Sequence, residues 1–221
     1  MLVSEAIAAR RSVRGYLDRP VDADVLRGIA TGAARAATGG NLQPWHVDLV
    51  HGEAMVRLKA IVAERMAAGS RETPQYDVYP KELVAPYRDR RFAIGEAMYR
   101  HIGIAREDKA GRLGWFARNY AFFGAPAALF VSVDRRMGPP QWADLGMYLQ
   151  NAMLLAVEAG LGTCAQEAWA MWPDTVGEFL DLPEERMLFC GLAIGYEDPA
   201  EPANRLRSAR ADPAEWFRDL G

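Results

Sequence analysis

The sequence is poor in cysteine and histidine, with two cysteines and three histidines among 221 residues. Cys164 and Cys190 lie in apolar stretches without the spacing of a zinc site, and two thiols cannot form a disulfide framework. We therefore expect no metal site, and we expect both thiols to be buried and reduced. His46, His51 and His101 are dispersed along the chain, which favours structural histidines over a catalytic one.

The sequence also lacks an excess of either charge and any long apolar run. Its 26 basic and 29 acidic residues give a formal net charge of -3, which argues against the broad basic surface that general nucleic-acid binding requires. No stretch approaches the roughly 20 apolar residues of a membrane span, and the N-terminus lacks the features of a signal peptide. We expect a cytoplasmic protein that binds neither nucleic acid nor membrane.

The sequence is rich in hydrophobic residues, which make up half of the chain. A chain of this length and composition can enclose one large core, so we expect a single domain over residues 1–221. Helix-rich segments between a few strands, without regular βαβ alternation, favour an α+β fold. Apolar spacing predicts helices over 22–37, 53–68, 92–104, 109–122, 141–159 and 173–180, and strands over 45–50, 127–133 and 187–196.

Two segments indicate contacts beyond a simple core. The predicted helix over 141–159 is apolar on more than one face, which suits burial at the centre or against a partner chain. Residues 70–91 contain three prolines and three tyrosines, which is typical of a long excursion. Long ordered loops in compact domains are usually lids or binding segments.

Two motifs in the N-terminal part could bind a cofactor. Residues 10–14, Arg-Arg-Ser-Val-Arg, offer planar, permanently charged donors beside a hydroxyl group, a combination that suits a phosphomonoester. Taken alone, these cations fit better as partners of a helix C-terminus and of Asp18 or Asp22. Residues 39–45, Gly-Gly-Asn-Leu-Gln-Pro-Trp, let a flat ligand approach the backbone, but an ordinary turn capped by Asn41 explains them equally well.

Two further motifs lie in the C-terminal part. Residues 160–169, Gly-Leu-Gly-Thr-Cys-Ala-Gln-Glu-Ala-Trp, follow the apolar helix and could place backbone N–H groups against a ring, or could simply connect a helix to a strand. Residues 204–210, Asn-Arg-Leu-Arg-Ser-Ala-Arg, gather more cations, or form a solvated basic tail.

In this order the four motifs resemble the FMN-dependent nitroreductase family over nearly the whole chain. The family pattern is Arg-Arg-Ser-x-Arg, then Asn-x-Gln-Pro-Trp, a Gly-Leu-Gly-Thr loop after a long helix, and a basic C-terminal segment. Residues 86–91, 95–96, 122–126 and 195–199 are similar to the nitrobenzoate-reductase-like branch. The resemblance implies a nitroreductase-like fold with a central mixed β-sheet flanked by helices, in an interlocked homodimer that binds FMN at the subunit interface.

Residue by residue, the resemblance implies a set of cofactor contacts. Arg10, Arg11 and Ser12 would hold the FMN phosphate or ribityl chain, and Arg14 would approach the pyrimidine edge. The tail would add Arg207 or Arg210, although Arg205 also fits a plausible register.

The remaining implied contacts lie near the flavin ring. Thr38, Gly39, Asn41 and Gln43 would come from the partner chain or meet the ring edge. Backbone amides near Gln166 and Glu167 would face the flavin N5 atom. Here the chain departs from the family, because Ala-Gln-Glu-Ala stands at 165–168 where many members have a proline before Ile-Glu-Gly.

The resemblance further implies a ping-pong reaction in which NADH or NADPH donates hydride and a nitroaromatic or similar small acceptor receives it. Because a flavin performs such chemistry, we expect no catalytic side chain. Residues 70–115 are expected to form a lid that selects the acceptor. Tyr76, Tyr79 or Phe92 could stack on its ring, and Arg88, Arg90 or Arg91 could pair with a carboxylate, with Tyr79 and Arg88 as the chosen candidates. For any one arginine, a solvated helix face is the competing interpretation.

Other functions share the same cofactor motifs. A flavin enzyme acting on another acceptor, such as a dehalogenase, an enone reductase or a flavin-degrading enzyme, would differ mainly between residues 70 and 115. A non-catalytic flavin-binding protein would keep the basic cluster but would not turn over NADH or NADPH.

Overall fold

The computed structural model describes residues 1–221 and arranges them around a four-stranded sheet. The strands lie in the order β1 (His46–His51), β2 (Ala127–Asp134), β4 (Arg186–Gly195) and β3 (Gly162–Gln166). All three pairings are antiparallel. The α+β expectation is therefore confirmed, and the parallel pairing expected of a mixed sheet is limited to one bridge, between Ser12 and Thr163 at the edge of β3. Whether a strand runs parallel or antiparallel to its neighbour depends on the end of the sheet at which the connecting segment enters. The pattern of apolar residues along the strand does not predict this direction.

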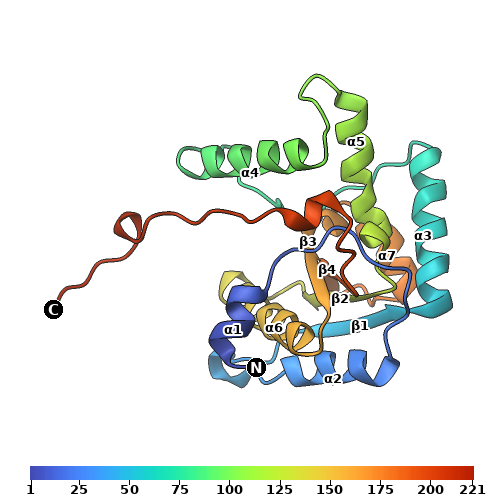
Figure 1. Ribbon diagram of the computed structural model, residues 1–221. Coiled ribbons are helices and arrows are strands. Elements are labelled where there is room, and N and C mark those ends of the chain that lie inside the picture. Colours follow the sequence, from blue (N-terminus) through green and yellow to red (C-terminus); the bar gives the residue numbers. More distant parts are fainter.

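Helices cover both faces of the sheet (Figure 1). One face carries α2 (Ala23–Ala33) and α6 (Pro139–Glu158), with α1 (Val3–Ala9) packed on α6. The other carries α3 (Gly52–Ala67), α7 (Pro173–Leu180) and the 3-10 turn Arg118–Gly124. Alternate residues of β2 pack into the two opposite clusters, Leu129 and Val131 into one and Phe130 into the other. Both faces are thus buried, which explains why β2 is apolar from Ala127 to Val131.

The helix predicted over 109–122 is shorter than expected. Helix α5 spans Lys109–Ala117 and continues as the 3-10 turn, which ends where Phe122 and Phe123 take left-handed φ values of 51° and 54°. Here the Phe122 ring stacks on Trp169 with their centroids 4.6 Å apart. This aromatic packing in the core accompanies the end of the turn, and local periodicity does not show it.

Three segments stand away from the sheet: α4 (Tyr87–His101), α5, and the chain beyond Arg205 (Figure 1). Helix α4 buries no residue. The connection before it is tethered, because the Glu72 carboxylate accepts hydrogen bonds from the backbone N–H groups of Asp174 (2.7 Å) and Thr175 (3.1 Å) at the start of α7. None of the helices combines the length and apolarity that a membrane span requires.

Candidate functional site

A cleft of about 820 Å³ opens where the segment after α1, helix α4 and the C-terminal segment meet. Two of the four sequence motifs, which stand near opposite ends of the chain, line this one cleft. The N-terminal segment contributes Arg10, Arg11, Ser12 and Arg14, and the C-terminal segment contributes Leu206, Arg207, Ser208 and Arg210.

The N-terminal segment reaches the cleft because it lies against the edge strand β3. Helix α1 ends at Ala9, and the backbone N–H of Val13 donates a hydrogen bond of 2.8 Å to the carbonyl of Thr163. The Val13 side chain is buried over Gly162, where an added Cβ would lie 2.6 Å from Val13 Cγ2. Because side chains alternate along extended backbone, burial of Val13 directs its neighbours Ser12 and Arg14 into the cleft.

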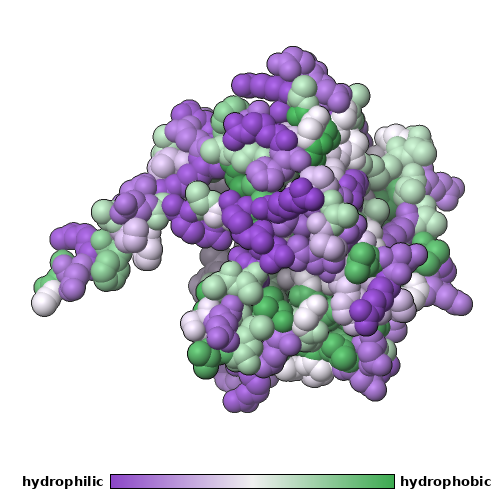
Figure 2. All heavy atoms as spheres, in the orientation of Figure 1, coloured by the Kyte–Doolittle hydropathy of each residue, from purple (hydrophilic) through white to green (hydrophobic).

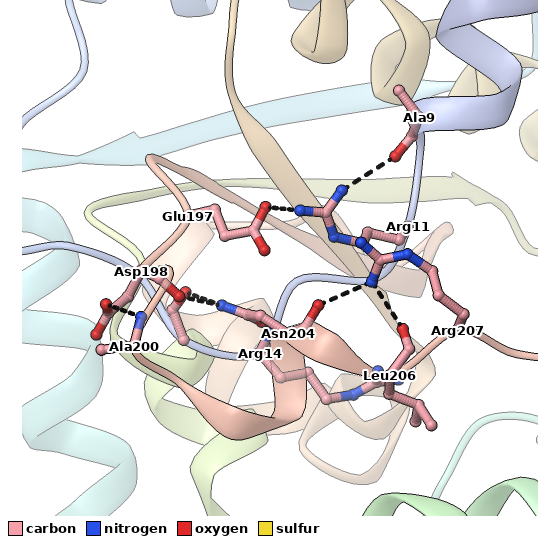
Figure 3. A network of polar contacts seen from close by, with 10 residues as sticks. Ala9, Arg11, Arg14, Glu197, Asp198, Ala200, Asn204, Leu206 and Arg207 are labelled. Carbon is pink, nitrogen blue, oxygen red and sulfur yellow. Dashed lines mark hydrogen bonds and ion pairs between the residues drawn. The ribbon is translucent and has the colours of Figure 1, made fainter. Parts of the chain in front are cut away.

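One buried amide joins the two ends of the chain at this point (Figure 3). Asn204 Oδ1 accepts a hydrogen bond of 2.7 Å from the backbone N–H of Arg14, and Nδ2 donates to the carbonyls of Gly15 (2.8 Å) and Asp198 (2.9 Å). Its own carbonyl accepts from Arg207 Nη1 at 2.9 Å. Sequence reasoning missed this role, because Asn204 stands at the start of what reads as a basic tail.

The cleft is strongly cationic. Seven arginines line it, of which Arg11 pairs with Glu197 and Arg88 pairs with Asp89, which leaves five without a carboxylate partner. Those five are Arg10, Arg14, Arg91, Arg207 and Arg210. The single carboxylate in the lining, Glu96, is held by Arg112 at 2.5 and 3.1 Å. This pairing lowers the pKa of Glu96, so the carboxylate stays ionised, and its ion-pair partner is Arg112 rather than one of the cleft arginines.

The donor set fits a phosphate dianion and a neighbouring polar ring system, as FMN presents. Guanidinium groups match phosphate oxygens in geometry and charge, and Ser12 adds a hydroxyl donor. Buried polar atoms without a protein partner are rare and point to a missing ligand or water. Arg11 Nε, in a residue that lines the cleft, is one such atom.

The motif at residues 38–45 does not reach this cleft. Thr38, Gly39, Asn41 and Gln43 lie in and beside the 3-10 turn Gly39–Asn41, with Asn41 and Gln43 exposed at positive φ. The backbone N–H of Gln43 donates to Thr38 Oγ1 at 3.3 Å, and its side-chain amide donates to the Asn41 carbonyl at 3.2 Å. A non-glycine residue in this conformation is strained, which is typical of a segment shaped for a contact.

Gln166 and Glu167 also lie outside the cleft lining. Gln166 ends β3, and its buried amide donates to the backbone carbonyl of Asn119 at 2.9 Å, so the side chain points into the protein. Partial burial raises the pKa of Glu167. The Gln166 side chain is therefore not available for a cofactor ring, whereas Glu167 is exposed.

The two expected acceptor contacts have different environments. Arg88 lines the cleft and pairs with Asp89 at 2.9 Å. Tyr79 is exposed and does not line the cleft, but the Arg91 guanidinium lies over its ring, with Cζ 4.2 Å from the centroid. Tyr79 therefore contacts a residue that lines the cleft, Arg91, rather than the cleft itself.

Comparison with known sequences identifies one protein family and several relatives within it. Residues 7–196 match the profile of the Nitroreductase family. The chain is 33% identical to the nitrobenzene nitroreductase of Ectopseudomonas oleovorans, over 97% of this chain and 95% of the relative. It is 32% identical to a 4-nitrobenzoate reductase of Pseudomonas putida, over 92% and 89% of the two chains.

Solved structures agree with the sequence matches. The chain resembles the FMN and NADPH-dependent nitroreductase NfnB of Sphingopyxis sp. strain HMH, with a TM-score of 0.96 and 49% identity over 100% of both chains. It also resembles the FMN-dependent nitroreductase NfnB of Mycobacterium smegmatis in complex with NADPH, with a TM-score of 0.93 and 28% identity over 99% and 98% of the chains.

Proposed function

Because the chain belongs to the nitroreductase family, we propose that it is an FMN-dependent oxidoreductase that transfers hydride from NADH or NADPH to nitroaromatic or similar small acceptors. Relatives named for nitrobenzene and nitrobenzoate reduction, and a similar structure described as FMN and NADPH-dependent, support this function. The observation that carries it is the cleft, which is lined by Ser12 and by five arginines without carboxylate partners.

Bound FMN supplies the hydride chemistry, so no side chain needs to act as a nucleophile. The task of the chain is to bind and orient. Arg10, Ser12 and the arginines of the C-terminal segment hold the phosphate through charge-assisted hydrogen bonds. Arg11, already paired with Glu197, fixes the N-terminal segment to the end of β4 and offers its unpartnered Nε to the ligand.

Arg14 has a different role from its neighbours. Its backbone N–H is held by Asn204, and its guanidinium has no carboxylate partner and makes only a 3.5 Å hydrogen bond to the Ser12 carbonyl. A fixed cation beside the pyrimidine edge of the cofactor stabilises negative charge there. The backbone amides at Gln166 and Glu167 complete the ring contacts in this proposal.

The protein is proposed to work as a homodimer with FMN at the subunit interface. The exposed C-terminal segment carries Trp216, Phe217 and Leu220. Apolar side chains also gather over α1 and α6 (Figure 2), where Leu2, Leu155 and their neighbours line a groove of about 240 Å³. Monomers rarely expose such surfaces to water, and a second copy is the simplest partner. Residues 38–43 of that second subunit complete the cofactor site.

The substrate segment and the cellular location follow from the same proposal. Residues 70–115 form the acceptor-selecting part of a single domain, since α4 within it forms one wall of the cleft. The use of NADH or NADPH, which are cytosolic reductants, supports a cytoplasmic location in this proposal.

Steady-state kinetics test the proposed function. Nicotinamide and acceptor use one cleft in turn, so double-reciprocal plots with NADPH and 4-nitrobenzoate varied together are expected to give parallel lines. Intersecting lines would show that both ligands bind at once. The absence of turnover by the FMN-loaded protein would favour a non-catalytic flavin-binding protein.

A further inference from the structure

Helix α4 forms one wall of the cleft, yet it buries none of its residues. Its side chains Met98 and Tyr99 pack against the core, and both are only half-buried. The neighbouring helix α5 is anchored more firmly, because the Trp115 ring is buried in the core. Since burial of an apolar face is what normally fixes a helix, the position of the α4 wall depends in large part on its contacts with α5.

One arginine of α5 joins the two helices. The Arg112 guanidinium donates to both oxygens of the Glu96 carboxylate, at 2.5 and 3.1 Å, and its Nε donates to the carbonyl of Ala105 at 3.1 Å. The same group lies over the Tyr99 ring, with Cζ 4.1 Å from the ring centroid. All three guanidinium nitrogens are thus used, and the bidentate pairing with Glu96 is the strong form of an arginine–carboxylate contact.

Arg112 stands behind the cleft wall. Glu96 and Tyr99, three residues apart on one face of α4, line the cleft, whereas Arg112 does not. The side chains of Arg112 and Glu96 are only 20% and 24% exposed, so water screens this pair less than it screens the exposed pairs made by Arg88 and Arg90. One residue outside the cleft therefore holds two residues of its wall.

The pair has an electrostatic consequence, because Glu96 is the single carboxylate in a lining that contains seven arginines. In the intact pair, the Arg112 guanidinium compensates its charge at 2.5 Å. Without Arg112, the ionised carboxylate would repel an anionic ligand in the cleft. The loss of Arg112 makes this wall more negative by one charge, whichever way the freed carboxylate turns.

We propose that Arg112 is a positioning residue that determines how well the cleft accepts an anionic aromatic acceptor. It acts through Glu96, whose charge it compensates, and through Tyr99, whose ring it holds in the wall of the cleft. The inference rests on the proposed function, which supplies the nitroaromatic acceptor. It extends that function to a side chain that lies outside the cleft lining.

The test uses FMN-loaded protein and the ratio of kcat/KM for 4-nitrobenzoate to kcat/KM for nitrobenzene, with the reductant held constant. Arg112→Ala is expected to lower this ratio about tenfold, because the freed carboxylate repels only the anionic acceptor. Adding Glu96→Gln to Arg112→Ala removes the freed charge and should return the ratio to within about threefold of the wild type. Arg100→Ala is the matched control, since Arg100 is exposed on α4 and outside the cleft, and it should change the ratio by about twofold at most.

The rescue separates this role from a purely structural one. If Arg112 only stabilised the two helices, the double variant would be no better than Arg112→Ala, and that result would overturn the inference. An unchanged ratio in Arg112→Ala with FMN retained would overturn it as well and leave the proposed function intact. Loss of FMN from Arg112→Ala would place the freed carboxylate beside the cofactor phosphate and would also overturn the assignment to the acceptor.

Glu96→Gln alone tests the inference even if Arg112→Ala does not fold. The glutamine still accepts a hydrogen bond from Arg112 but leaves the guanidinium charge uncompensated, so the ratio should rise about two- to fivefold. An unchanged or lower ratio would overturn the inference. In calorimetric titrations, benzoate should bind more tightly to Glu96→Gln, and more weakly to Arg112→Ala, than to the wild type. Failure of the wild-type, FMN-loaded protein to reduce either acceptor would reject the proposed function, while the benzoate titration would still test the role of Arg112.

Discussion

At the residue scale, the site depends on a side chain that carries no charge. The amide of Asn204 is buried and uses both of its ends, accepting from Arg14 and donating to Gly15 and Asp198. Aspartate has nearly the same shape, but it places a carboxylate oxygen against two carbonyl oxygens. A buried charge facing acceptors is strongly unfavourable.

We therefore expect Asn204→Asp to lower the free energy of unfolding by about 2 to 4 kcal/mol and to weaken FMN binding. Urea denaturation and a fluorescence titration with FMN measure the two effects. Gln75→Glu is the control, because Gln75 Oε1 accepts one longer hydrogen bond from the backbone N–H of Leu188 (3.3 Å) outside the cleft and should leave FMN affinity unchanged. Equal FMN affinity in both variants would remove Asn204 from the site.

The two thiols illustrate a residue-scale expectation that the structure confirms, since Cys164 and Cys190 are both free and buried. Burial raises the pKa of each thiol. In the unfolded chain the thiols ionise near their ordinary pKa of 9.0, whereas in the folded chain they stay protonated to higher pH. The protonated thiols therefore contribute to the stability of the fold below pH 9, and this contribution is lost as the pH rises.

We expect the free energy of unfolding to fall above pH 9, and the fall to be smaller in the Cys164→Ser variant, which should also retain most activity. Denaturation curves between pH 7 and about 10.5 check the sign. A thiol reagent should label neither cysteine at pH 7 until the protein unfolds. Rapid labelling of the native protein would contradict the account.

At the scale of elements, the sequence predicted best the segments that bury an apolar face. The periodicity over 141–159 and 173–180 corresponds closely to α6 and α7. Helix α4 starts at Tyr87 rather than at residue 92, because a helix without buried residues has no apolar periodicity to mark its first turn. Strand direction, the end of α5 and the role of Asn204 depend on contacts between distant segments, which no local pattern contains.

As with the helices and strands, only part of the candidate site could be predicted from the sequence. The basic motifs after α1 and in the C-terminal segment meet in one cleft, whereas the motifs around Asn41 and Gln166 do not line it. A conjunction of motifs predicts which residues serve one cofactor, but not which subunit or which atoms present them.

Helix α4 should control the choice of acceptor. Arg88→Ala is expected to lower kcat/KM for 4-nitrobenzoate about tenfold relative to nitrobenzene, because only the former has a carboxylate to pair with this arginine. Tyr79→Ala should also alter acceptor kcat/KM, since it releases Arg91. FMN content should remain near that of the wild type in both. Release of FMN, or unchanged values for every acceptor, would exclude this role.

At the scale of the whole molecule, the exposed apolar surfaces should determine the assembly. The wild type is expected to sediment as a dimer, and a chain ending at residue 211 to shift toward monomer, because it lacks Trp216, Phe217 and Leu220 but keeps the cleft arginines. Analytical ultracentrifugation at several concentrations measures the shift. A wild type that remains monomeric at every concentration would contradict the proposed assembly.

The central claim is that the arginine cleft binds the phosphate of FMN, and a flavin titration of the apoprotein tests it most directly. Riboflavin has the same ring system without the phosphate, so FMN is expected to bind at least about 100-fold more tightly. Arg10→Ala should remove much of that difference, while Arg35→Ala, exposed and outside the cleft, should preserve it. Equal affinity of the wild type for riboflavin and FMN would contradict the account.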